Sequence, residues 1–192
     1  MTRILILQGH PDPAEGHFDH ALADAYREGA ERAGLAVDAF PIAQRDFPLL
    51  RSQAEFLEEA VPPAILEAQE LIEVANHLVL VYPLWMGDMP ALVKGFLEQV
   101  FRPSFVGDGD MNQLRHTRLR GRSVRIVVTM GMPAPIYRWF YRAHSLRSLE
   151  RNVFLFCGFS PVRHTLIGQS GGNAASRERW LEKMRELGGQ AK

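Results

Sequence analysis

The chain has 192 residues, and its 22 Lys and Arg side chains are balanced by 22 Asp and Glu, so the formal net charge is zero. This balance gives no global attraction to nucleic acid or to an acidic membrane surface, and it favours a small-molecule partner. The length fits one domain, residues 1–192, whose core needs neither disulfides nor a structural metal. The chain has one cysteine, and the apolar run Ile4 to Leu7 is too short for a signal peptide or a membrane span, so we expect a cytoplasmic protein.

Apolar patterns in the first half of the chain alternate between strand and helix. Arg3 to Gln8 is a continuous apolar run typical of a strand covered on both faces. From Phe18 to Ala30, apolar residues recur about every four positions, which predicts a helix that ends at Gly34. The next predicted elements are a strand at Ala36–Phe40, a connection with one short helix at Pro41–Pro63, a helix at Ala64–Val74, a strand at His77–Tyr82 and a helix at Ala91–Phe101.

The second half continues the alternation with two more strands and three helices. They are predicted at Ser123–Thr129, Tyr137–Tyr141 (an aromatic helix), Leu146–Cys157, Val162–Ile167 and Ala174–Leu187. Strands that alternate with helices form a parallel sheet with right-handed crossovers. The sequence therefore predicts an α/β fold with five strands in a doubly wound sheet and helices on both faces.

Several sequence motifs that would indicate other functions are absent or incomplete. The chain contains neither the Gly-rich dinucleotide fingerprint nor a P-loop. Gly168 to Gly172 matches the G-x-S-x-G pattern of hydrolases, but the last histidine, His164, precedes the serine, so we interpret this segment as a turn into a helix capped near Asn173.

Two clusters of polar residues have a plain interpretation. His10, Asp12, His17, Asp19 and His20 lie close in sequence, but no second ligand pair completes a four-ligand site, so we expect no metal. The basic stretch from Arg115 to Arg125 is interpreted as a solvated face, with a phosphate contact as the alternative.

Three loops follow predicted strands one, three and four, at residues 9–18, 83–89 and 130–137. In the flavodoxin-like order 2-1-3-4-5 these strand tips meet at one edge of the sheet, where ligands of open parallel sheets bind. The first loop leads into a helix N-terminus near Gly16 to Asp19, which favours a phosphate. The second loop offers a flat apolar wall around Trp85, and the third contains Gly131, with Tyr137 beyond it. Phosphate at one end and a flat ring at the other describe a flavin nucleotide.

The chain also resembles the flavodoxin-like NAD(P)H dehydrogenase (quinone) family over nearly its whole length. The matching segments, in order, are Gly9-His10-Pro11, Phe18 to Leu22, Pro83-Leu84-Trp85, Pro90 to Phe96, and Thr129-Met130-Gly131 with Tyr137. The resemblance implies that FMN or FAD is reduced by NADH or NADPH and reoxidised by a quinone or a related small electron acceptor. It also implies a homodimer, in which part of the aromatic surplus at Tyr137–Tyr141, Phe154, Phe156 and Phe159 would be buried.

The resemblance assigns expected roles to thirteen residues. The flavin phosphate and ribityl chain would be met by His10, His17, Phe18 and Asp19; the ring edge by Pro83, Leu84, Trp85 and Met86; and the pyrimidine end by Thr129, Gly131 and Met132. Tyr137 and His144 would be catalytic, next to the acceptor.

Three positions depart from the family pattern, namely His17, Asp19 and Gly87. An acidic side chain beside a flavin phosphate is unfavourable unless it caps the helix. If these residues abolish flavin binding, the alternative is a flavodoxin-like regulatory subunit of a transporter or another partner, with little or no turnover.

Overall fold

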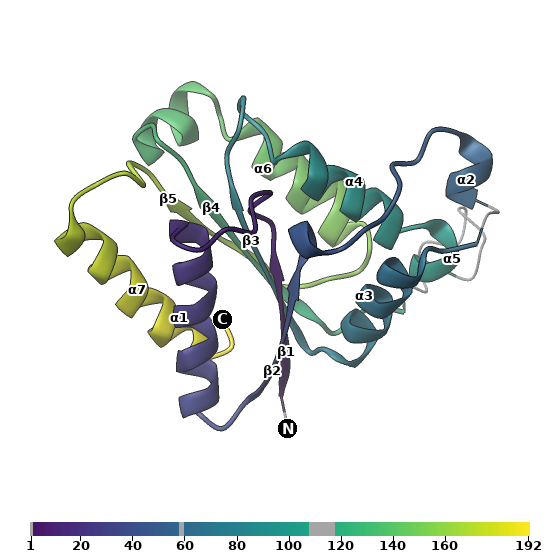
Figure 1. Ribbon diagram of the computed structural model, residues 1–192, viewed down its shortest axis with the longest axis horizontal. Helices are drawn as coiled ribbons and strands as arrows, with labels where there is room; N and C mark the ends of the chain where they lie inside the picture. The colour runs from purple at the N-terminus through teal and green to yellow at the C-terminus, as the bar shows by residue number, and fades with distance from the viewer. Residues whose placement is uncertain (1, 58–59, 108–117) are drawn as a thin grey trace.

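The computed structural model describes residues 2–57, 60–107 and 118–192 (Figure 1). Its centre is one parallel sheet with the strand order β2-β1-β3-β4-β5. The strands are β1 Arg3–Gln8, β2 Ala36–Pro41, β3 His77–Pro83, β4 Ser123–Thr129 and β5 Val162–Ile167. The flavodoxin-like order predicted from the sequence is confirmed.

Helices cover both faces of the sheet. One face carries α1 (Phe18–Arg32) and α7 (Ala174–Gly189), and the other carries α3 (Pro63–Val74), α4 (Ala91–Val100) and α6 (His144–Ser148) (Figure 1). Shorter helical segments are η1 Ile42–Gln44, α2 Gln53–Leu57, α5 Pro103–Val106, η2 Ile136–Phe140 and η3 Leu149–Leu155. No helix in the described ranges is both long and apolar enough to cross a membrane.

The central strand β3 is buried along its whole length. Side chains alternate along a strand, so Leu80 and Tyr82 belong to the core beneath α3 and α4, whereas Val79 and Val81 belong to the core beneath α1 and α7. This burial on both faces explains the unbroken apolar run that predicted the strand.

Helices α1 and α7 approach each other so closely that glycine is required at two contacts. A Cβ atom on Gly29 would lie 1.9 Å from the carbonyl oxygen of Arg185, and one on Gly188 would lie 2.0 Å from that of Tyr26. These distances are far below van der Waals contact, so any side chain at either position would force the two helices apart. The two glycines therefore fix how α1 lies against α7.

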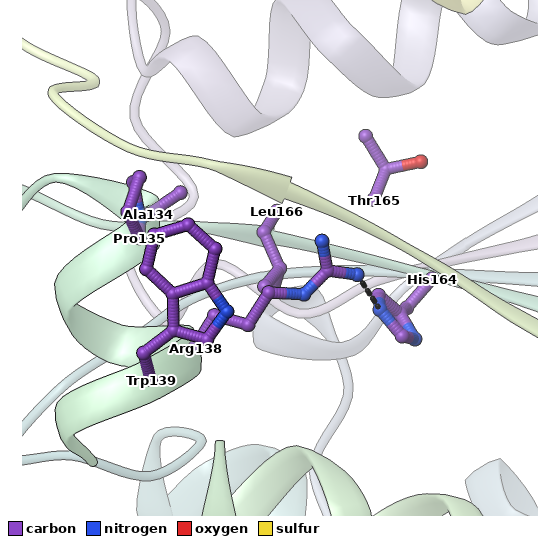
Figure 2. Close-up of a pocket in the computed structure, with 7 residues that line it drawn as sticks. All are labelled: Ala134, Pro135, Arg138, Trp139, His164, Thr165 and Leu166. Carbon is purple, nitrogen blue, oxygen red and sulfur yellow. Dashed lines mark hydrogen bonds between the residues drawn. The ribbon is translucent and has the colours of Figure 1, made fainter. Parts of the chain in front are cut away.

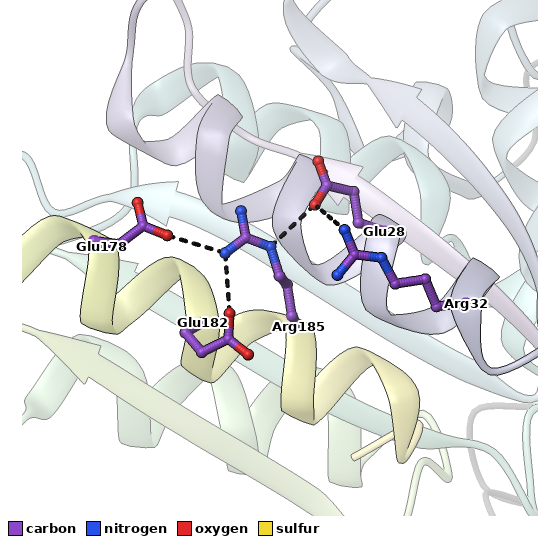
Figure 3. A network of polar contacts seen from close by, with 5 residues as sticks. All are labelled: Glu28, Arg32, Glu178, Glu182 and Arg185. Atoms are coloured by element: carbon purple, nitrogen blue, oxygen red, sulfur yellow. Dashed lines mark hydrogen bonds and ion pairs between the residues drawn. The ribbon is translucent and has the colours of Figure 1, made fainter.

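The outer side of the same helix pair carries an ion-pair network centred on Arg185 (Figure 3). Its Nε donates to Glu28 on α1 at 3.0 Å, and its Nη1 contacts Glu178 and Glu182 at 3.1 and 3.2 Å. Arg32 approaches Glu28 from the other side at 3.6 Å. These charges are largely exposed, so the network contributes little to the free energy of unfolding. The close glycine contacts, not these ion pairs, set how the two helices pack.

A buried polar chain lies at the amino ends of the strands, opposite the strand tips. The Tyr26 hydroxyl is 2.9 Å from His77 Nε2, and His77 Nδ1 is 2.7 Å from the Ser123 hydroxyl. Burial lowers the pKa of His77 to about 4, because the charged imidazole would lose its hydration. His77 is therefore a neutral, hydrogen-bonded part of the core at neutral pH.

The structure differs from the predicted elements at a few boundaries. Strand β3 extends to Pro83, and the next main-chain N–H, that of Leu84, donates to Thr129 O at 2.7 Å. The helix expected at Leu146–Cys157 begins at His144 and becomes π-helical in η3, and the aromatic segment η2 is also π-helical. The expected cap is confirmed, because the Asn173 side chain accepts the Ser176 N–H at 2.9 Å.

The basic stretch before β4 has structural roles where the structure describes it. Arg122 donates to the main-chain oxygens of Glu73 and Ala75, and buried Arg125 donates to the Thr165 hydroxyl at 2.7 Å. The interpretation as a uniformly solvated face is therefore wrong for these two arginines, because each satisfies buried or main-chain acceptors. Arg115 and His116 lie outside the described residues.

Candidate active site

The three strand tips are joined to one another by specific contacts. The His10 ring in the first loop meets the Trp85 ring in the second edge to face, with centroids 6.2 Å apart. The second loop is bonded to β4 through Leu84 and Thr129. The Thr129 hydroxyl lies 3.0 Å from each carboxylate oxygen of Asp19, at the start of α1. The convergence expected from the strand order is therefore present.

The first loop leaves the N-terminus of α1 without a side-chain cap. His17 occupies the cap position but makes no capping hydrogen bond, because its Nε2 instead pairs with Asp12 Oδ2 at 2.9 Å. The His17 ring stacks on the His10 ring with centroids 3.9 Å apart. The first-turn N–H groups of a helix have no partner within the helix, so this end can bind an anion.

The Asp19 side chain points into the protein rather than toward the loop. It is 4% exposed and bonded to Thr129, while Phe18 beside it is covered by the Arg177 guanidinium at 4.6 Å. Burial raises the pKa of Asp19, although the Thr129 hydroxyl partly offsets this effect. Asp19 is not the cap residue of α1, and its carboxylate is buried against Thr129 rather than exposed to solvent.

The second loop is a tight hairpin turn that presents two apolar side chains to solvent. Trp85 N donates to Asp88 O at 2.8 Å, and Asp88 N donates to Trp85 O at 2.9 Å. The two residues between them, Met86 and Gly87, have φ values of 50° and 84°, as in a type I′ turn. Glycine at position 87 therefore allows the positive φ that this turn requires. The turn leaves Trp85 51% exposed and Met86 fully exposed.

The third loop has an open position at Gly131. A Cβ built on this residue would meet nothing within 4 Å, and its φ is not in the left-handed region, so no contact within the described chain requires glycine there. Met130, just before it, is buried, and its carbonyl accepts the Ser170 N–H at 3.0 Å. A fixed loop with free space above a glycine is a suitable surface for a flat ring.

A pocket of about 310 Å³ opens between the second and third loops. It is lined by Met86, Gly87, Met132, Tyr137, Tyr141 and His144. Both residues expected to be catalytic, Tyr137 and His144, thus face one pocket, together with two residues expected at the flavin ring, Met86 and Met132. Its mainly apolar walls suit a small planar molecule.

Tyr137 is held in place by residues that the sequence did not single out. Its side chain is 2% exposed, its hydroxyl lies 2.7 Å from the Ser145 hydroxyl, and it accepts the Leu146 N–H at 3.2 Å. His144 is exposed at the start of α6. Ser145 lies in no recognisable motif. It reaches the Tyr137 hydroxyl because the chain turns between η2 and α6, and the sequence does not predict this turn.

Three histidine rings, those of His10, His17 and His20, lie close together near the first strand tip. In the ranges that the structure describes, no three His, Cys, Asp or Glu side chains are arranged to hold a metal ion. The His10, His17 and His20 rings pack against one another, stacked in one pair and edge to face in the other two.

The described residues fit a flavin nucleotide in three respects. An uncapped helix N-terminus lies at one end of the site, a half-exposed indole at the ring position, and the open space above Gly131 at the other end. The helix N-terminus suits the phosphate, the Trp85 indole suits the flat ring, and the space above Gly131 lets the pyrimidine end of the ring come close to the backbone.

The chain is similar to proteins of known family. A family model described as "Flavodoxin-like fold" matches residues 2–187. An uncharacterized NAD(P)H oxidoreductase from Haemophilus influenzae is 27% identical over 169 residues, which are 85% of this chain and 82% of that protein.

Two solved structures share the fold at low sequence identity. An NAD(P)H:quinone oxidoreductase from Methanothermobacter marburgensis is 24% identical with a TM-score of 0.80, covering 97% of this chain and 94% of that one. An FMN-dependent NADH-azoreductase from Bacillus anthracis, solved in complex with FMN, is 14% identical with a TM-score of 0.75, covering 99% of each chain. The family match spans nearly the whole sequence and agrees with the observed strand order, so this chain belongs to the family of proteins with a flavodoxin-like fold.

Proposed function

We propose that the protein is a flavin-dependent NAD(P)H oxidoreductase that reduces quinones or related electrophiles. The observation that carries the proposal is the meeting of the three strand tips, where the α1 N-terminus, Trp85 and Gly131 lie next to a pocket that contains Tyr137. The relatives named as NAD(P)H and quinone oxidoreductases support it. The FMN-dependent azoreductase supports FMN, with FAD as the alternative cofactor.

The cofactor would accept a hydride from NADH or NADPH and pass two electrons to the acceptor. The chain's own residues bind and orient it. The first-turn N–H groups of α1, with His10, His17 and Phe18, would hold the phosphate and ribityl chain, and Asp19 accepts a hydrogen bond from the Thr129 hydroxyl. Pro83, Leu84, Trp85 and Met86 would line the ring edge. Main-chain N–H groups near Thr129, Gly131 and Met132 would hold the pyrimidine end, where they could stabilise negative charge.

Tyr137 and His144 would act on the acceptor in the adjoining pocket. Because the Tyr137 hydroxyl is bonded to Ser145 and Leu146, its ring has a fixed position. The exposed His144 imidazole can supply or accept a proton as the acceptor is reduced.

A homodimer would complete this pocket. The side chains of Met86, Phe140 and Tyr141 are exposed around it, and the Phe140 and Tyr141 rings contact each other with centroids 5.0 Å apart. By contrast, Phe154 and Phe159 are buried in the chain's own core, so they are not among the aromatic residues that a dimer would cover. A monomeric mass by light scattering at micromolar concentration would contradict the dimer.

A visible spectrum tests the function directly. The purified protein, with and without added FMN or FAD, should show bound flavin absorbance that bleaches with NADH or NADPH and returns when a quinone is added. Bound flavin without turnover would favour the regulatory alternative. Failure to bind either flavin would contradict the proposal.

A further inference from the structure

A second pocket, of about 340 Å³, lies between η2 and the edge strand β5 (Figure 2). Its walls come from Pro135, Arg138 and Trp139 on one side and from His164 and Leu166 on the other. None of these residues lines the pocket that contains Tyr137 and His144, although Tyr137 and Arg138 are neighbours in sequence. The short helix η2 therefore separates two different cavities.

The pocket contains the Arg138 guanidinium, which forms no ion pair with a carboxylate in the ranges that the structure describes. Within the described part of the chain, the contact recorded for the Arg138 guanidinium is a long one, 3.5 Å from Nη2 to His164 Nε2. A guanidinium can only donate, so Nε2 accepts this contact and Nδ1 of the same ring donates to Glu150 at 2.7 Å. Figure 2 shows the Arg138 guanidinium reaching toward the His164 ring.

The charges around Arg138 favour a single negative charge on the ligand. Arginine's planar fork matches a carboxylate in bidentate fashion. The Glu150 carboxylate lies just behind His164, and it would repel a dianion such as a phosphate monoester. A monoanionic carboxylate is therefore a better match than a phosphate.

The rest of the pocket is apolar apart from Thr165, and it includes a broad aromatic surface. Trp139 is 75% exposed, and its indole lies beside Pro135 at the mouth of the cavity (Figure 2). Leu166 closes the opposite wall. An exposed indole offers a flat face on which an aromatic ring can stack, next to the carboxylate-binding arginine.

We propose that this pocket is a binding site for small aromatic carboxylates, distinct from the flavin and acceptor site. The ring of the ligand stacks on Trp139 and contacts Leu166, and its carboxylate pairs with Arg138, which His164 and Glu150 hold in place. The pocket volume is sufficient for an acid with one or two fused rings.

Calorimetric titration with 1-naphthoate tests this site, with 1-naphthalenemethanol as the neutral analogue of the same shape. On the protein as purified, and again after saturation with FMN, naphthoate should bind on the order of tenfold more tightly than the alcohol, because only the acid forms charge-assisted hydrogen bonds. Arg138→Gln should remove that difference, and Trp139→Leu should weaken both ligands. Arg147→Gln, which removes an exposed arginine from α6, is the matched control and should bind both ligands as the unaltered protein does.

Four results would overturn the proposal. They are equal affinity for the acid and the alcohol, unchanged affinity for naphthoate in Arg138→Gln, displacement of naphthoate by FMN or NADH, and a loss of binding as the protein concentration rises, which would mean that a second copy covers the pocket. The indole N–H resonance of Trp139, assigned by its absence in Trp139→Leu, should shift on adding naphthoate. Circular dichroism confirms that each variant is folded, so loss of binding cannot be attributed to unfolding. Because binding is measured with and without flavin, its failure is distinguishable from failure of the proposed enzymatic function.

Discussion

Both carboxylate oxygens of Asp19 lie 3.0 Å from the Thr129 hydroxyl, so that the start of α1 is bonded to the end of β4 across 110 residues of sequence. The contact is buried and joins the two ends of the proposed flavin site. Replacing Thr129 with Val would leave the buried carboxylate without its donor, and we expect a loss of about 1–3 kcal/mol in the free energy of unfolding. Thr129→Ser retains the hydroxyl and should lose much less in urea denaturation. Equal stability of the Val and Ser variants would show that the bond contributes nothing.

Gly131 and Gly87 should respond in opposite ways to alanine. The space above Gly131 is open and its φ is unstrained, so Gly131→Ala should leave the melting temperature unchanged but lower the affinity for FMN about tenfold or more, because the new methyl group occupies the ring's position. Gly87 has a φ of 84°, so Gly87→Ala should cost about 1–2 kcal/mol of stability by strain alone. Thermal unfolding and fluorescence titration with FMN separate the two effects. A Gly131→Ala variant that binds FMN normally would contradict the placement of the ring.

Trp85 should contribute to flavin affinity through its half-exposed indole. We expect Trp85→Ala to weaken FMN binding about tenfold, because the apolar surface along the ring edge is lost, and Trp85→Phe to retain most of that affinity. Trp139→Ala, which removes a more exposed indole outside the proposed flavin site, serves as the control and should leave FMN affinity unchanged. Equal FMN affinity in the Trp85→Ala variant and the unaltered protein would show that the Trp85 side chain does not contact the flavin.

Tyr137→Phe should slow turnover with little change in the dissociation constant of FMN. The substitution keeps the buried ring but removes the hydroxyl that accepts the Leu146 N–H, at a cost of about 1 kcal/mol in stability. Ser145→Ala retains the tyrosine hydroxyl and removes only its neighbour, so it should reduce kcat less. Steady-state kinetics with a quinone distinguish the pair. Unchanged kcat in Tyr137→Phe would show that the hydroxyl has no part in the reaction.

His77 should make the stability fall in acid. Its ordinary pKa of 6.5 applies to the unfolded chain, and burial lowers it to about 4 in the folded protein. Between these values the unfolded chain binds the extra proton, so the contribution of neutral His77 is complete above pH 6.5 and is lost as the pH falls toward 4, by about 3 kcal/mol in total. Urea denaturation at several pH values should show a shallower dependence in this window for His77→Gln. A parallel dependence in both proteins would mean that other groups cause the loss.

The element order and the sheet order could be predicted from the sequence because both depend on local patterns. The unbroken apolar run of β3 reflects the burial of both faces of that strand. The four-residue spacing of apolar residues in α1 reflects the burial of one face of that helix. The short helix α5 and the π-helical geometry of η2 and η3 could not be predicted, since no hydrophobic period distinguishes them from neighbouring turns.

The meeting of the three strand tips could also be predicted, but not the orientation of the side chains there. Strand order placed Trp85 and Thr129 at one edge. However, the inward direction of Asp19 depends on a partner 110 residues away, and Tyr137 depends on Ser145, which lies beyond an unpredicted turn. Gly87 looked like a departure from the family pattern, and only its backbone angle shows that the turn requires it.

The close contact of Gly29 and Gly188 with the facing helix backbones has a consequence for synthesis on the ribosome. Helix α1 carries the anion-binding end of the proposed site, yet the helix that covers it is α7, translated more than a hundred residues later. Until α7 emerges, apolar residues such as Leu22 and Tyr26 lack part of their core. The nascent chain therefore supports α1 fully only after α7 has emerged, and we expect it to bind the cofactor only after that point in elongation.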